Sequence, residues 1–174
     1  FGFYDVFLVN TEGEIVYSVF KEIDFATSRL NGPYRESNFA EAFRVALENG
    51  KQGRGESVAF VDFQRYTPSY QAPASFTASP ILEKGECIGV AVIQTPIDPV
   101  NEIMAQKTGM GETGESYLVG SDFLMRSDSY LNPEQFSVVA SFAQPESRKI
   151  ETRATSQAIA GNSGAGVIES RSGS

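Results

Sequence analysis

The sequence predicts an α+β fold, a five-stranded antiparallel sheet with a helix inserted after its second strand. Three observations lead to this prediction. Runs rich in aromatic and β-branched residues, which favour strands, form two groups: two runs before residue 21 and three between residues 57 and 96. Short turns join the runs of the first group and the last two of the second, as in hairpins. A long loop and one helical pattern separate the groups, so the helix is an insert.

The composition limits the possible functions. The chain has 174 residues, which suits one domain, or one domain and part of a second. Fourteen Lys and Arg against 22 Asp and Glu give a net charge of −8, so we expect no nucleic-acid partner. The chain has no histidine, which excludes Ser-His and Cys-His nucleophile pairs and imidazole metal ligands. The single cysteine, Cys87, lies in an apolar run and is predicted to be a core residue. We predict neither a metal nor a cofactor.

The first two strands are predicted at Tyr4 to Asn10 and Ile15 to Phe20, with a turn between them. Both faces of the second strand carry apolar residues, so each face needs a cover. Residues 21–37 show no regular period and contain the turn signal Asn31-Gly32-Pro33, which predicts an irregular loop. Loops of this length are often functional.

The inserted helix is predicted to begin at Ser37 or Asn38, whose side chains can accept a backbone N–H of the first turn, with Glu41 in capping-box position. Asn49-Gly50 predicts its end. Its apolar residues recur at helical spacing, at Phe39, Phe43, Ala46 and Leu47. The remaining strands are predicted at Ser57 to Tyr66, Ala74 to Leu82 and Glu86 to Pro96, followed by a helix at Ile97 to Thr108.

This order of elements is the layout of a PAS-like domain, which we place at residues 1–108. Residues 109–174 are predicted to form a hinge and a truncated second PAS-like lobe. Its expected elements are a hairpin of Ser116 to Gly120 with Phe123 to Ser127, a helix at Glu146 to Ala160 and a strand at Gly166 to Glu169. Gly109, Gly111 and Gly114 spell G-x-G-x-x-G, but a helix precedes them and a strand follows, the reverse of a dinucleotide site. We interpret these glycines as a helix stop and a hinge.

The strand predicted at residues 57–66 carries the main candidate for ligand binding. Strand alternation places Phe60, Asp62, Gln64 and Tyr66 on one face. A carboxylate in the middle of a strand is uncommon, and under a cover Asp62 needs hydrogen-bond donors. A ligand ammonium or hydroxyl group would provide them, as would Arg35, a tyrosine or the N–H groups of a loop.

Further candidates surround this face. The two loops that would close over it contribute rings and donors from Tyr34, Arg35, Tyr66 and Tyr70. Ordinary packing with an exposed hydroxyl is the alternative role for each tyrosine. Ser79, on the next strand, is small and polar and would line a cavity.

Three segments carry a resemblance to a known family. They are the opening YDVFLVNTEGEIVYSVFKEIDFATSRLNGPY, the hairpin SPILEKGECIGVAVIQTPID and the segment TGMGETGESYLVGSDFLMRSDS. They resemble the Cache sensor regions of bacterial chemoreceptors, and the likeness extends over nearly the whole chain. The third segment resembles the junction between the membrane-distal and membrane-proximal lobes of double Cache domains.

The resemblance implies a periplasmic input domain of a methyl-accepting chemotaxis protein, anchored in its parent protein by two membrane helices. In the family a small metabolite binds between the sheet and the loop-helix insert, and no catalytic residue is implied. The segment from Asp62 to Tyr70 stands nearest to that place. Because the chain has no tryptophan, it lacks the Arg-x-Trp-Tyr signature of the amino-acid-binding subgroup.

The leading hypothesis is therefore a ligand-binding sensor domain of a chemoreceptor. The alternatives are the same fold serving a histidine kinase or cyclase, a small enzyme using Asp62 with Arg35, and a structural dimerisation module. We also expect a homodimer along the N-terminal region. In the family a helix precedes the first strand, and without it Phe3, Phe7 and Val9 would be exposed. The chain begins at Phe1 rather than Met, which favours a segment of a longer protein.

Overall fold

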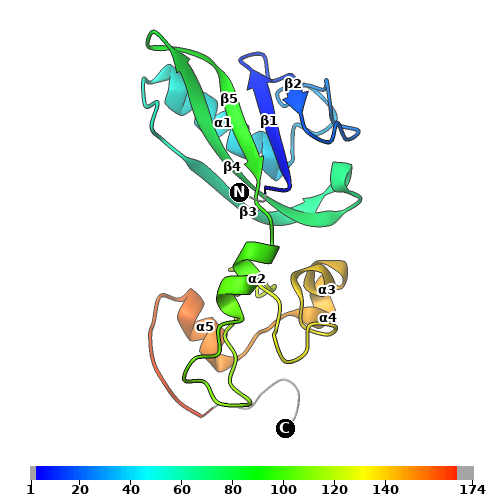
Figure 1. The fold of residues 1–174 in the computed structure, drawn as a ribbon, viewed down its shortest axis with the longest axis vertical. Helices are drawn as coiled ribbons and strands as arrows, with labels where there is room; N and C mark the ends of the chain where they lie inside the picture. The colour runs from blue at the N-terminus through cyan, green and yellow to red at the C-terminus, as the bar shows by residue number, and fades with distance from the viewer. Residues whose placement is uncertain (1–2, 168–174) are drawn as a thin grey trace. The chain divides into compact units, whose positions relative to one another are not determined.

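A computed structural model describes residues 3–167. The chain forms two compact units that divide between Pro96 and Ile97 (Figure 1). The sequence analysis placed this boundary at residue 108. In the structure the helix at residues 98–104 lies in the second unit instead of the first. Among the described residues, no helix combines the length and the apolar character that crossing a membrane requires.

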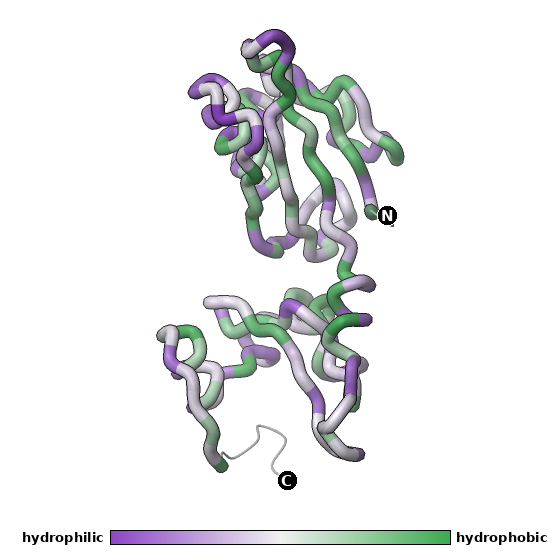
Figure 2. The backbone as a smooth tube through the Cα atoms, turned by 60° about the vertical axis from the view of Figure 1, so that its left-hand side comes forward, coloured by the Kyte–Doolittle hydropathy of each residue, from purple (hydrophilic) through white to green (hydrophobic). Residues whose placement is uncertain are grey.

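The first unit is an antiparallel sheet with one helix against it, as the sequence predicted. The strands are β1 (Asp5–Asn10), β2 (Ile15–Ser18), β3 (Ala59–Tyr66), β4 (Ala72–Glu83) and β5 (Glu86–Gln94). They lie in the order β2-β1-β5-β4-β3, and every neighbouring pair is antiparallel. Helix α1 (Asn38–Lys51) packs against β3, β4 and β5. Hydrophobic residues concentrate in the central strands, and hydrophilic residues in several of the turns between them (Figure 2).

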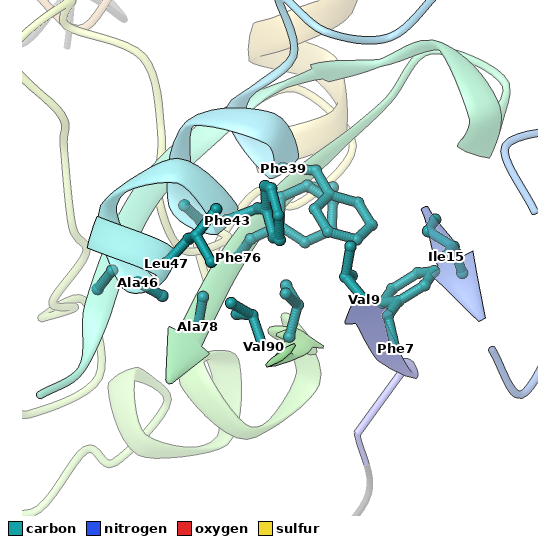
Figure 3. Close-up of a cluster of buried hydrophobic side chains, with 14 of the residues drawn as sticks. Phe7, Val9, Ile15, Phe39, Phe43, Ala46, Leu47, Phe76, Ala78 and Val90 are labelled. Carbon is teal, nitrogen blue, oxygen red and sulfur yellow. The ribbon is translucent and has the colours of Figure 1, made fainter. Parts of the chain in front are cut away.

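The space between α1 and the sheet is filled with hydrocarbon (Figure 3). The ring of Phe39 lies 4.8 Å from that of Phe7 and 5.0 Å from that of Phe76, centroid to centroid. The remaining labelled members of this core are Val9, Ile15, Phe43, Ala46, Leu47, Ala78 and Val90. No ligand would fit beneath α1 without displacing this core, so the part of the expected site that would lie under the helix is filled.

Helix α1 begins as predicted and ends one residue later than predicted. Ser37 is the N-cap, and its hydroxyl accepts the N–H of Ala40 at 3.2 Å. Asn38 is buried, and its Nδ2 donates to the carbonyl oxygens of Asp62 at 3.0 Å and Ala74 at 2.7 Å. Gly50 does not stop the helix, which continues to Lys51. A Cβ at position 50 would lie 2.5 Å from the sulfur of Cys87, so this glycine allows helix and sheet to approach each other.

Strand β1 buries the face that contacts α1 and exposes the opposite face. Phe7 and Val9 are buried against α1, so the prediction that they are exposed is wrong. On the opposite face Leu8 pairs with Tyr17 of β2, and both side chains are exposed. Strand β2 ends at Ser18, two residues before the predicted end.

Strand β3 contains a β-bulge between Val61 and Gln64. Before the bulge, Val61 pairs with Phe76 on the α1 face, so Phe60 points to the opposite face. Before the bulge, the even-numbered residues of β3 point away from α1. After it, the even-numbered residues Gln64 and Tyr66 point toward α1, and Tyr66 is buried in the core. The predicted common face of Phe60, Asp62, Gln64 and Tyr66 is therefore wrong, because the extra residue reverses the alternation.

The second unit contains four short helices among its described residues, joined by turns and irregular segments. Its helices are α2 (Asp98–Met104), α3 (Val138–Ala143), α4 (Pro145–Arg148) and α5 (Arg153–Ile159). The predicted hairpin is reduced to one bridge between Val119 and Met125, and α3 was not predicted. The predicted helix over residues 146–160 is interrupted because the N–H of Ile150 donates to the carbonyl of Phe123 at 2.8 Å. Residues 166–167 are not in a strand, and the rest of that predicted strand lies outside the described residues.

Helix α2 is fixed within this second unit. Asn101 donates from Nδ2 to the carboxylate of Asp128 at 2.9 Å, and its Oδ1 accepts the N–H of Asp128 at 2.7 Å. These bonds explain why the compact unit begins before the predicted hinge. A truncated second PAS-like lobe stays a prediction.

Candidate functional site

The loop between β2 and α1 folds back against the first hairpin. The N–H of Ile15 donates to the carbonyl of Thr27 at 3.3 Å, and the N–H of Arg29 donates to the carbonyl of Gly13 at 2.5 Å. Gly13 has a φ of +84°, and a Cβ there would lie 2.9 Å from the side chain of Leu30. Ala26 adopts a φ of 59°, a left-handed conformation that is uncommon for a residue with a Cβ. The loop is therefore held in one path by the first hairpin.

This path buries an ion pair. Asp24 and Arg29 are both 0% exposed, and Arg29 Nη2 lies 3.0 Å from Asp24 Oδ2. The same Nη2 donates to the backbone oxygen of Asp24 and to Thr27 Oγ1, each at 3.1 Å. Tyr66, at the end of β3, donates its hydroxyl to Asp24 Oδ2. Loop and sheet thus meet at one carboxylate oxygen.

Two aromatic rings flank the guanidinium group. The carbon Cζ of Arg29 lies 4.6 Å from the centroid of Phe39 and 5.4 Å from that of Tyr34. Both distances are within the range of a cation–π contact. The positive charge of Arg29 is therefore stabilised by two rings as well as by the carboxylate of Asp24.

The hydrogen bonds of this pair are incomplete. Asp24 Oδ1, Arg29 Nε and Arg29 Nη1 are buried and have no hydrogen-bond partner within residues 3–167. Most buried polar atoms have a partner, because desolvation without one costs about 1 to 3 kcal/mol. Two donor groups and one acceptor on adjacent side chains are thus available to a molecule that reaches them.

More carboxylates lie at the same end of the sheet. Glu22 accepts the hydroxyl of Ser69 at 2.8 Å and that of Tyr4 at 3.4 Å. Asp5 is buried and accepts the hydroxyl of Ser18 at 2.9 Å. Burial, assisted by the charges of Asp24 and Asp5 and opposed by the bond from Ser69, raises the pKa of the Glu22 carboxyl.

Burial also raises the pKa of the Tyr66 hydroxyl, and the negative charge of Asp24 adds to this effect while the positive charge of Arg29 opposes it. The phenol therefore remains protonated at neutral pH. It acts as a hydrogen-bond donor that ties Asp24 to the sheet.

A hollow of about 240 Å³ opens between the end of the loop before α1 and the end of β3. One wall comes from the end of the loop before α1, and the other from the end of β3 and the following helical turn η1 (Thr67–Ser69). The lining residues are Pro33, Tyr34, Glu36, Ser37, Gln64, Arg65, Thr67 and Pro68. Tyr34 belongs to both features, since it lines the hollow and its ring contacts Arg29.

The sequence-predicted site residues are divided among several places. Tyr34 and Gln64 line the hollow, and Tyr66 is buried next to it in the bond to Asp24. Arg35 is exposed and pairs with Glu36 at 3.3 Å.

The other three predicted residues lie outside the hollow. Asp62 is exposed in the bulge, and its carboxylate accepts the N–H of Phe63 at 2.7 Å. Tyr70 is 92% exposed, at the end of η1. Ser79 lies on the sheet face opposite α1 and donates to the carbonyl of Ser57 at 3.1 Å. We therefore do not include these three residues in the candidate site.

Sequence reasoning missed Asp24, Arg29 and Glu22, although it marked their loop as functional. The available signal was two opposite charges five residues apart in a segment that also contains Ile23, Phe25 and Leu30. Within residues 3–167 no group of three or more acidic, cysteine or histidine side chains is arranged to hold a metal ion.

These features define a PAS-like α+β fold with a hollow between its inserted loop and the end of β3. Neither a protein-family model nor a curated protein sequence matches the chain. The solved ligand-binding domain of the Campylobacter jejuni chemoreceptor Tlp3, in complex with 4-methylisoleucine, is 13% identical with a TM-score of 0.51, over 78% of this chain and 46% of that one. The ligand-binding domain of the Pseudomonas fluorescens chemoreceptor CtaA, in complex with L-serine, is 13% identical with a TM-score of 0.49, over 88% and 57%.

The sensor domain of the V. cholerae histidine kinase DctB is 17% identical with a TM-score of 0.41, over 60% of this chain and 35% of that one. The chain thus spans about half the length, or less, of these domains. The match to the Tlp3 domain shows a shared fold, which confirms the predicted α+β class. The resemblance to Cache sensor regions is confirmed at the level of the fold.

Proposed function

We propose that this chain is the extracytoplasmic ligand-binding part of a membrane-anchored chemoreceptor, and that it binds a small molecule at the hollow next to Arg29. One observation carries the proposal. Three hydrogen-bonding atoms of a buried ion pair have no partner within residues 3–167, and Tyr34, which lines a hollow of about 240 Å³, contacts the guanidinium group of that pair. Ligand sites of this kind combine a concave surface with a few polar groups of fixed orientation.

The unpartnered atoms indicate the chemistry of the ligand. Arg29 Nε and Nη1 need an acceptor, which a carboxylate provides best, and Asp24 Oδ1 needs a donor such as an ammonium or hydroxyl group. Small amino acids and hydroxy acids carry both groups. We therefore propose a ligand of this class, although the chain lacks the signature expected for the amino-acid-binding subgroup.

Signalling would follow from the position of the pair. Asp24 and Arg29 belong to the loop, whereas Tyr66 belongs to the sheet. A ligand that completes their hydrogen bonds favours one arrangement of the loop, and a receptor signals by its difference in affinity for two arrangements. The rest of the receptor determines whether the output is a chemotaxis transducer, a histidine kinase or a cyclase.

A thermal-shift screen of the purified chain against amino acids, hydroxy acids, amines and sugars tests the proposal. A ligand at 100 times its dissociation constant adds about 2.7 kcal/mol to the free energy of unfolding. We expect Gln64→Leu, inside the hollow, to reduce this shift, and the matched control Asp62→Ala, outside it, to retain it. Retention in Gln64→Leu with loss in Asp62→Ala would move the site to the exposed carboxylate.

The same screen addresses the alternatives. Turnover of any compound that binds would favour the enzyme, although neither Asp62 nor Arg35 lines the hollow. A complete absence of binding would favour the structural dimerisation module. The homodimer stays a prediction, and Leu8 and Tyr17 replace Phe7 and Val9 as the exposed residues that would form it.

A further inference from the structure

One side chain links the hollow to the buried ion pair. Tyr34 lines the hollow, is only partly buried, and places its ring 5.4 Å from Cζ of Arg29. Arg29 itself is 0% exposed and is not among the residues that line the hollow. Among the residues that line the hollow, Tyr34 is therefore the one for which the structure shows a contact with the guanidinium group.

The two rings that flank Arg29 are held very differently. Phe39 is fully buried, and its ring contacts those of Phe7, Phe76 and Tyr66 at 4.8, 5.0 and 6.3 Å. Moving it would disrupt the core. The hydroxyl of Tyr34, in contrast, makes no hydrogen bond to any described residue, and the contact with Arg29 is the one specific interaction that the structure shows for this ring. The ring of Phe39 is thus held firmly in the core, whereas the ring of Tyr34 is held, within the described part of the chain, only by its contact with Arg29.

The backbone around Tyr34 is firmly placed, so a movement of the ring does not require a movement of the loop. The N–H of Gly32 donates to the carbonyl of Ser28 at 2.9 Å, and the N–H of Ser37 donates to the carbonyl of Tyr34 at 3.1 Å. Rotation of a partly exposed side chain about χ1 needs no change in these bonds.

We propose that Tyr34 is a gate between the hollow and the Asp24–Arg29 pair. This gate would regulate access to the binding site, so its biological purpose rests on the proposed function. With the ring in place, the guanidinium group is closed off from the hollow. When the ring rotates away, Arg29 Nε and Nη1 become accessible, and an anionic oxygen of the ligand replaces the ring as a partner of the positive charge. The gate therefore selects ligands that are small enough for the hollow and that carry such an oxygen.

Chemical modification of arginine tests the gate without knowledge of the ligand. Methylglyoxal adds to guanidinium N–H groups, and peptide mass spectrometry gives the rate at each arginine. We expect Arg29 in the wild-type chain to react at least tenfold more slowly than exposed Arg35. Tyr34→Ala should accelerate modification of Arg29 at least tenfold, whereas Tyr34→Phe should keep the wild-type rate because it retains the ring.

Tyr70→Ala is the matched control, since it removes an exposed tyrosine ring near the same end of the sheet and should leave the rate at Arg29 unchanged. Far-UV circular dichroism shows whether Tyr34→Ala is folded, and if it is not, Tyr34→Leu takes its place with the same expected acceleration. Equal protection of Arg29 in wild type and in the folded ring-less variant would overturn the gate, as would equal acceleration by Tyr34→Phe. These rates are measured without ligand, so a negative thermal-shift screen would refute the proposed function and leave the gate standing.

Discussion

Removing the charge of Arg29 should destabilise the first unit far more than removing an exposed arginine. Arg29 Nη2 lies 3.0 Å from Asp24 Oδ2, and both side chains are fully buried. At an effective dielectric constant of about 20, Coulomb's law gives about 5.5 kcal/mol at that distance. Loss of one member of a buried ion pair typically costs about 3 to 5 kcal/mol, because the other charge remains buried without compensation. We expect a loss of this size for Arg29→Met.

The double variant gives the sharper test. Asp24→Asn alone leaves Arg29 charged and should also cost about 3 to 5 kcal/mol. The combination Asp24→Asn with Arg29→Met removes both charges, and the Asn oxygen still accepts the hydroxyl of Tyr66. We expect the double variant to lose about 1 to 3 kcal/mol, less than either single variant, because groups in direct contact are not additive.

Urea unfolding followed by far-UV circular dichroism measures these differences. Arg35→Met is the control, because its ion pair with Glu36 is exposed on both sides and should change the free energy of unfolding by less than about 0.5 kcal/mol. A loss below about 1 kcal/mol for Arg29→Met, or a double variant that loses the full sum of the singles, would refute the view of Asp24 and Arg29 as a coupled buried pair.

Three further perturbations test other features. Asn38→Ala should cost about 2 to 4 kcal/mol in urea unfolding, because two strand carbonyls lose their donor; a cost near zero would contradict this. Glu22→Gln should raise the free energy of unfolding at pH 7, with a gain that shrinks as the pH falls toward 4.5. The reason is that burial raises the pKa of this carboxyl, so the fold favours its protonated form, and a gain independent of pH would contradict the explanation. Sedimentation equilibrium should show a dimer that Leu8→Lys converts to monomer, and a monomeric wild type would end the dimer prediction.

Most of the fold could be predicted because its signals are local. Strand alternation, hairpin turns and the helix cap at Ser37 depend on residues close together in the sequence, and the structure has all five predicted strands and the inserted helix. The bulge in β3 could not be predicted in this way. Asn38 donates to the backbone of Asp62, which is 24 residues away, and no sequence pattern near Asp62 predicts that bond. One extra residue then reversed every later assignment of a face in that strand.

The site was predicted less completely than the fold, for a related reason. Tyr34 and Gln64 were identified from their place in the loop and the strand, and both line the hollow. Asp24 and Arg29 were missed because a charged residue in an irregular loop is usually solvated. Burial of these charges depends on Phe39 and on Tyr66, the latter 42 residues from Asp24. Sequence patterns of period two or 3.6 contain no information about such a contact.

The buried ion pair favours the loop between β2 and α1 as the part of the first unit that would respond to a ligand. Beneath α1 the packing follows ordinary rules, with stacked rings, aliphatic side chains and a capped helix. Between β2 and α1, in contrast, Ala26 has a positive φ, and the opposite charges of Asp24 and Arg29 are buried with incomplete hydrogen bonds. Such departures persist at functional sites when the surrounding structure maintains them. Because Tyr66 joins this loop to β3, a ligand that stabilises the ion pair would also stabilise the contact between loop and sheet, which is the difference a receptor needs in order to signal.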